Sequence, residues 1–146
     1  MNMLESIEEQ FGFEQQDIRS FSPLTLAYLG DAVMEVVVRT VVIEQGNRPV
    51  NELHKISTSF VKAEAQAKMV LGLQEEFTEE ERQIIRRGRN AKPYTTAKNA
   101  SRADYHKATG FEALMGYLYL TGQAERMLLL VKKGMDLIAK NGEENE

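Results

Sequence analysis

The stretch from Pro23 to Ile43 is almost entirely apolar, and its Val-rich middle would also suit a β-strand. About 20 residues without a turn signal is long for a strand, however. Ser22 followed by Pro23 is a typical helix start, with Ser as the N-cap and Pro in the first turn. Gly46 then suits the end of the helix. The pattern therefore predicts one long helix over residues 23–45.

Three charged residues interrupt this apolar run, namely Asp31, Glu35 and Arg39. On a helix these positions are i, i+4 and i+8, so they share one face. Glu35 and Arg39 could form an ordinary i,i+4 ion pair, which leaves Asp31 as the residue without a structural explanation. Gly30 beside it costs helix stability, roughly 1 kcal/mol relative to Ala. A Gly at this position predicts close approach by another backbone.

A second apolar run, from Thr109 to Leu120, contains a single acid, Glu112, and has Gly116 one turn later. Two buried helices that each carry an acid and a nearby Gly could cross closely and bring Asp31 and Glu112 together. A carboxylate among apolar neighbours is costly unless it is paired or holds a metal. Hard oxygen ligands suit Mg²⁺, with Mn²⁺ as an alternative ion.

The rest of the chain reads as helical almost everywhere, and no segment is a convincing strand. This pattern predicts an all-α fold in which residues 1–22 are an acidic, partly helical N-terminal segment and residues 141–146 are a disordered charged tail. Within the domain at 23–140, the expected further helices are 50–73 in two pieces joined near Lys62, 78–89 opened by a capping box, 101–121 with a break at Gly110, and 123–140.

Composition narrows the class of protein. The 146 residues are enough for one domain with a real core. The absence of Cys excludes a disulfide framework and suits the cytoplasm. Charged residues interrupt the long apolar run, so it does not read as a membrane span. The two His residues are isolated, which argues against a zinc site.

Positive charge is concentrated in one window of an otherwise acidic chain. The chain has a net charge of −4, yet residues 82–107 contain eight Lys/Arg and one acid, a local charge of +7. This asymmetry indicates a polyanion partner, with a solvated charged helix and loop as the alternative. Side chains in the window that can donate to phosphates or sugar hydroxyls are Arg86, Arg87, Arg89, Asn90, Lys92, Lys98, Arg102 and Lys107.

Two motifs resemble a known family. Residues 27–35, Ala-Tyr-Leu-Gly-Asp-Ala-Val-Met-Glu, resemble the signature of the ribonuclease III catalytic domain. Residues 111–120, Phe-Glu-Ala-Leu-Met-Gly-Tyr-Leu-Tyr-Leu, resemble its second acidic motif, and residues 51–64 look like the helix between them. The resemblance covers about 23–140. The short chain and the Arg-Asn-Ala-Lys-Pro segment at 89–93 are similar to the Mini-III branch, whose members lack a double-stranded-RNA-binding domain and process bacterial ribosomal RNA precursors.

The resemblance implies a dimeric, ribonuclease III-like helical bundle with metal-dependent endonuclease activity on double-stranded RNA, leaving 5′-phosphate and 3′-hydroxyl ends. The expected substrate is a ribosomal RNA precursor of the 23S type, and the expected catalytic metal ligands are Asp31 and Glu112. Other acids of the family pattern are missing, because Leu24, Ala27 and Thr109 stand in their places. Glu35 is then a candidate replacement ligand.

Two alternatives remain open, the first of which follows from the missing acids. One is a catalytically inactive domain that binds duplex RNA. The other is a helical protein-interaction module whose basic window binds an acidic protein.

Overall fold

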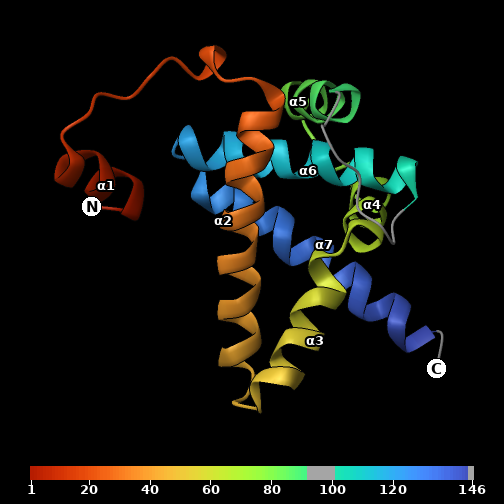
Figure 1. Ribbon diagram of the computed structural model, residues 1–146. Helices are drawn as coiled ribbons and strands as arrows, with labels where there is room; N and C mark the ends of the chain where they lie inside the picture. Colours follow the sequence, from red (N-terminus) through yellow and green to blue (C-terminus); the bar gives the residue numbers. More distant parts are fainter. Residues whose placement is uncertain (92–100, 145–146) are drawn as a thin grey trace.

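The computed structural model describes residues 1–91 and 101–144, and within them the regular secondary structure is all helical, with no strand (Figure 1). The predicted all-α fold is confirmed. The elements are α1 (Met3–Phe11), the short 3-10 helix η1 (Ile18–Ser20), α2 (Pro23–Glu44), α3 (Val50–Val61), α4 (Ala63–Gly72), α5 (Glu79–Asn90), α6 (Arg102–Leu120) and α7 (Ala124–Glu144).

The boundaries of α2 follow from its predicted cap. The Ser22 side chain accepts a hydrogen bond from the backbone N–H of Thr25 at 3.2 Å, and Pro23 occupies the first turn. This arrangement satisfies one of the free N–H groups at the helix start. The predicted long helix is therefore confirmed, and Asp31 lies in its N-terminal half.

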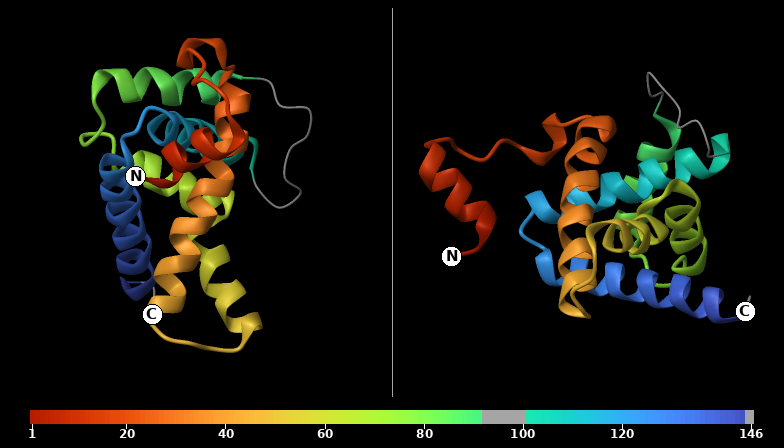
Figure 2. Two further views of the ribbon diagram at one scale, coloured as in Figure 1. Left: turned by 90° about the vertical axis from the view of Figure 1, so that its left-hand side faces the viewer. Right: turned by 60° about the horizontal axis from the view of Figure 1, so that its bottom comes forward.

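Helix α6 forms the centre of the fold, and both α2 and α5 cross it (Figures 1 and 2). Its fully buried side chains include Phe111, Leu114 and Leu118. The expected break at Gly110 is wrong, because α6 is continuous. A Cβ at Gly110 would lie 2.5 Å from the carbonyl oxygen of Ile85, so this Gly serves the close approach of α5.

The segment 50–73 is divided as predicted. Lys62 has an extended backbone, with φ −63° and ψ 155°, and separates α3 from α4. Thr78 and Glu81 form the predicted capping box at the start of α5. The buried Glu81 carboxylate also accepts hydrogen bonds from Arg126 of α7, at 2.8 and 2.9 Å, which ties the start of α5 to α7.

The two ends of the chain differ from each other. Helix α1 has no buried residue, but its Leu4 lines a groove together with Leu29 of α2 and Tyr119 of α6. Helix α7 continues to Glu144, so the expectation of a disordered tail from residue 141 is wrong for 141–144. Over the part of the chain that the structure covers, no helix is both long and apolar enough to span a membrane.

Candidate active site

Two glycines allow α2 and α6 to touch through their backbones. A Cβ built on Gly30 would lie 1.7 Å from the carbonyl oxygen of Glu112, and a Cβ on Gly116 would lie 2.0 Å from that of Leu26. Real side-chain carbons cannot approach so closely, so both positions require glycine. The predicted close crossing of the two acidic helices is confirmed.

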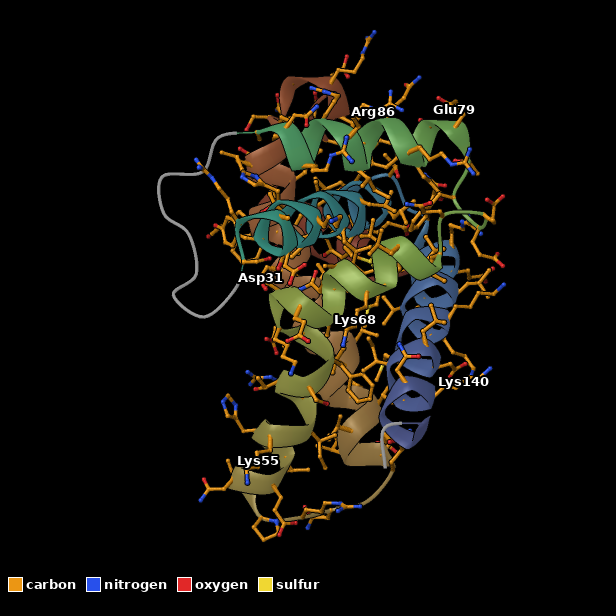
Figure 3. The ribbon with its side chains drawn as sticks, turned by 90° about the vertical axis from the view of Figure 1, so that its right-hand side faces the viewer. Asp31, Lys55, Lys68, Glu79, Arg86 and Lys140 are labelled. Atoms are coloured by element: carbon orange, nitrogen blue, oxygen red, sulfur yellow. The ribbon has the colours of Figure 1, made fainter. Side chains whose placement is uncertain are left out.

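The crossing brings Asp31 and Glu112 into contact although 81 positions separate them in the chain. Burial, and after it the hydrogen bond and charge of Asp31, raise the pKa of Glu112 from 4.5 to about 8, whereas a hydrogen bond from Gln66 opposes this shift. Glu112 is half-buried. Asp31 itself is exposed, although its neighbours in the sequence are apolar. Figure 3 shows Asp31 beside α6 and the upper end of the α3–α4 pair.

Two roles were predicted for Glu35, an ion pair with Arg39 and binding of the metal ion, and the structure shows the ion pair. Glu35 Oε2 accepts a hydrogen bond from Arg39 Nε at 3.0 Å, in an i,i+4 ion pair. Its negative charge nevertheless contributes to the raised pKa of Glu112. Among the described residues no three His, Cys, Asp or Glu side chains are grouped closely enough to hold a metal ion. A role for Glu35 as a metal ligand therefore stays a prediction.

The Asp31–Glu112 pair has the donor chemistry for a hard divalent cation. Two carboxylates that face each other repel, and a cation between them favours the ionised form of both. Mg²⁺ keeps several waters and is usually bound by only one or two protein carboxylates. A site with two protein carboxylates therefore fits Mg²⁺, and its remaining ligand positions would be filled by water and substrate.

A third side chain, Gln66 of α4, touches this pair and was not expected from the sequence. Gln66 is 2% exposed, and its Nε2 donates to the Val61 carbonyl at 2.7 Å and to Glu112 Oε2 at 3.4 Å. The available signal was a polar residue flanked by Ala65 and Ala67 on a buried helix. That signal does not indicate which side chain the amide meets.

The basic residues gather mainly on α5, which crosses the helix that carries Glu112. Arg86, Arg87, Arg89 and Asn90 are all exposed on it, and Figure 3 shows Arg86. Arg102 is exposed and Lys107 half-exposed in the first turns of α6, whereas Lys92 and Lys98 lie outside the described residues. Within the described ranges no ion pair involves the arginines at 86, 87 and 89, and the assignment of these residues to RNA binding stays a prediction.

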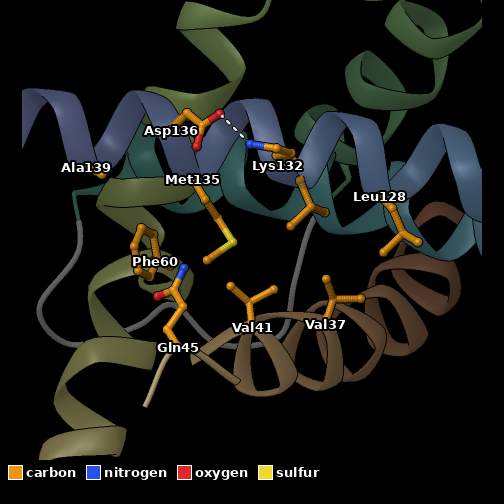
Figure 4. A pocket seen from close by; sticks show the side chains of 10 residues that line it. Val37, Val41, Gln45, Phe60, Leu128, Lys132, Met135, Asp136 and Ala139 are labelled. Atoms are coloured by element: carbon orange, nitrogen blue, oxygen red, sulfur yellow. Dashed lines mark hydrogen bonds and ion pairs between the residues drawn. The ribbon is translucent and has the colours of Figure 1, made fainter. Parts of the chain in front are cut away.

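An apolar groove of about 470 Å³ lies elsewhere, between α2, α3 and α7 (Figure 4). Val37, Phe60 and Met135 are among its lining residues. Its two charged side chains, Lys132 and Asp136, are joined to each other at 3.1 Å. The groove includes neither carboxylate of the acidic pair, so it is not the candidate active site.

Comparison with protein families identifies the chain. Residues 24–123 match the ribonuclease III domain, and this region includes α2, α6 and both acids of the pair. The chain belongs to the ribonuclease III family. Within this family it is similar to proteins named Mini-ribonuclease 3, as the resemblance in its motifs predicts.

Two such relatives cover most of the chain. The protein from Thermoanaerobacter sp. (strain X514) is 43% identical over 94% of this chain and 96% of its own length. The protein from Symbiobacterium thermophilum is 48% identical over 81% of this chain and 91% of its own length. An X-ray crystal structure of a Fusobacterium nucleatum protein is 30% identical and superposes with a TM-score of 0.74, over 88% of this chain and 98% of its own.

The structure explains two departures from the ribonuclease III pattern. Thr109 is 5% exposed, and its hydroxyl donates to the carbonyl of Tyr105 at 3.0 Å within α6. Ala27 is 7% exposed and packs in a small apolar cluster with Leu26 and Ala113. Neither position presents a carboxylate, so Asp31 and Glu112 are the family acids that this chain retains at the crossing.

Proposed function

We propose that this chain is a Mg²⁺-dependent endoribonuclease that hydrolyses double-stranded RNA, with Asp31 and Glu112 as its catalytic metal ligands. The observation that supports this most directly is the glycine-mediated crossing of α2 and α6, which brings two acids from distant motifs into contact. The match to the ribonuclease III domain spans both motifs. Mn²⁺ is the expected substitute ion, because it also accepts oxygen ligands.

The chemistry divides between the metal and the protein. A bound divalent cation lowers the pKa of a water molecule and stabilises negative charge on the scissile phosphate. Asp31 and Glu112 would hold it through their carboxylates, and the close crossing of α2 and α6 fixes where these two side chains begin. Glu35 can join them if its carboxylate leaves Arg39. The products carry a 5′-phosphate and a 3′-hydroxyl, as in the family.

Phosphate contacts are assigned to the basic residues of α5 and the start of α6. Arg86, Arg87 and Arg89 are exposed on α5, where guanidinium groups can each bind a phosphate through two N–H donors. Asn90, Arg102 and Lys107 extend the same set. Such contacts position the duplex without reading its sequence.

The biological substrate is proposed to be a ribosomal RNA precursor, of the 23S type, in the cytoplasm. The support is the resemblance to the Mini-III branch and the naming of the relatives. The active form is proposed to be a homodimer, whose two sites cut the two strands. Tyr28 and Val36 of α2 are 83% and 60% exposed, and a second copy would bury these apolar side chains.

The decisive experiment incubates the purified protein with a long RNA duplex, with and without Mg²⁺, beside the Asp31→Asn variant. We expect cutting that requires Mg²⁺, products with 5′-phosphate ends, and no cutting by the variant, which keeps the volume of the side chain but loses its charge. Because Asp31 is exposed, the variant should retain the circular dichroism spectrum of the wild type. Duplex binding without any Mg²⁺-dependent cutting would instead indicate an inactive RNA-binding domain.

A further inference from the structure

Gln66 is held in one orientation by two acceptors. Its backbone N–H bonds to the carbonyl of Lys62 in the first turn of α4. Its side-chain NH₂ group faces the Val61 carbonyl at 2.7 Å and Glu112 Oε2 at 3.4 Å. Both neighbours accept hydrogen bonds, so a flipped amide would place an oxygen against two oxygens. The nitrogen must therefore face Glu112, and the carbonyl oxygen must face away from these two acceptors.

The carbonyl oxygen of this amide has no partner. Gln66 Oε1 is buried and accepts no hydrogen bond from any described residue. A buried acceptor without a donor is unfavourable, and an apolar side chain of similar volume, such as Met, would fill the same space without that cost. Packing alone therefore does not account for a glutamine at this position, whereas the hydrogen bond that its amide nitrogen donates to Glu112 does.

We propose that Gln66 is a positioning residue of the metal site: its amide nitrogen orients the carboxylate of Glu112. This inference rests on the proposed function, since it requires a divalent cation at Asp31 and Glu112. Partners that orient a metal-ligating carboxylate typically change metal affinity or activity 10- to 100-fold when they are removed.

The first test measures Mn²⁺ binding to the whole protein by electron paramagnetic resonance, without RNA. Gln66→Met keeps the volume and removes both amide functions, so we expect Mn²⁺ to bind about tenfold more weakly. The matched control is Met69→Ala, on the buried face of the same helix. It should lower thermal stability and leave Mn²⁺ affinity unchanged. A folded Gln66→Met variant with wild-type Mn²⁺ affinity would overturn the inference.

The second test needs no substitution and so does not depend on a variant that folds. In the uniformly ¹⁵N-labelled wild-type protein, sub-stoichiometric Mn²⁺ should broaden the side-chain NH₂ signals of Gln66 before those of the exposed Gln83 on α5. Broadening of the Asp31 and Glu112 backbone amides with unaffected Gln66 signals would refute the positioning role and leave the proposed function standing. If no signal near this pair is broadened, the metal site is wrong, and the role of Gln66 is wrong with it.

Discussion

Gly30 and Gly116 face each other across the contact of α2 and α6, and neither position has room for a Cβ. The clash at Gly30 is with backbone, the Glu112 carbonyl oxygen at 1.7 Å, so no flexible side chain can move aside. The acidic pair therefore depends on the absence of two side-chain carbons. This relationship links the stability of the fold directly to the geometry of the candidate active site.

Gly30→Ala should destabilise the protein by about 3 kcal/mol, the upper end of the usual cost of overpacking, because the two helices must separate. The variant should also lose Mg²⁺-dependent cutting, since the carboxylates move apart. Urea unfolding followed by circular dichroism measures the first effect. Gly142→Ala in α7 is the control: a Cβ there meets nothing within 4 Å, so helix propensity should raise stability by about 0.5 kcal/mol. A Gly30→Ala variant as stable as wild type would contradict the close crossing.

The raised pKa of Glu112 makes the metal-free protein less stable as pH rises from about 4.5 to about 8. In that window the unfolded chain has released the Glu112 proton and the folded protein has kept it. The folded state thus binds more protons, and the free energy of unfolding falls with pH, by an amount on the order of a few kcal/mol. Below the window this contribution to stability is fully present, and above it the contribution is lost.

The measurement compares urea unfolding of wild type and Glu112→Gln across this pH range, in the presence of a chelator. The wild type should lose stability relative to the variant as pH rises, because Gln does not titrate. Mg²⁺ should remove most of the difference in slope, since a cation favours the ionised carboxylate. Parallel pH curves for the two proteins would show that Glu112 does not hold its proton above the usual range.

Thr109→Val tests whether Thr109 replaces the family acid as a metal ligand. The Thr109 hydroxyl is bonded to the Tyr105 carbonyl in its own helix, so we expect the variant to cut duplex RNA within about threefold of the wild-type rate. Stability should change by about 1 kcal/mol or less, the usual net value of one hydrogen bond. The half-saturating Mg²⁺ concentration for cutting is the decisive readout: a tenfold increase would assign the hydroxyl to the metal site.

The helices and the acidic pair could be predicted because local signals and tertiary structure agree. Ser22 caps α2 as its residue type suggests, and the Gly beside each acid indicated a close crossing. At Gly110 the local signal and the tertiary structure disagree, and the predicted break is wrong. Its low helix propensity favours a break, but close packing against Ile85 gives this Gly a role within a continuous helix.

The role of Gln66 could not be predicted because it depends on a contact between residues 46 positions apart. A single polar side chain on an apolar helix can face solvent, cap a helix end or form a hydrogen bond inside the core. Only the tertiary placement of α4 against α6 shows that its amide meets Glu112. The exposure of Asp31 could not be predicted on similar grounds, since apolar neighbours in sequence do not fix which face of α2 is covered.

The last prediction concerns the basic face of α5. Arg86→Ala with Arg89→Ala should weaken duplex RNA binding and lower the slope of log affinity against log salt by about 2, because each lost phosphate contact releases roughly one counterion fewer. Metal binding at Asp31 should be unchanged.

The control with equal charge loss is Lys68→Ala with Lys132→Ala, where both lysines form exposed i,i+4 ion pairs outside α5. Filter binding at several salt concentrations decides between the outcomes. If both double variants reduce the slope equally, net charge alone explains binding; if the arginine variant matches wild type, α5 does not contact the RNA.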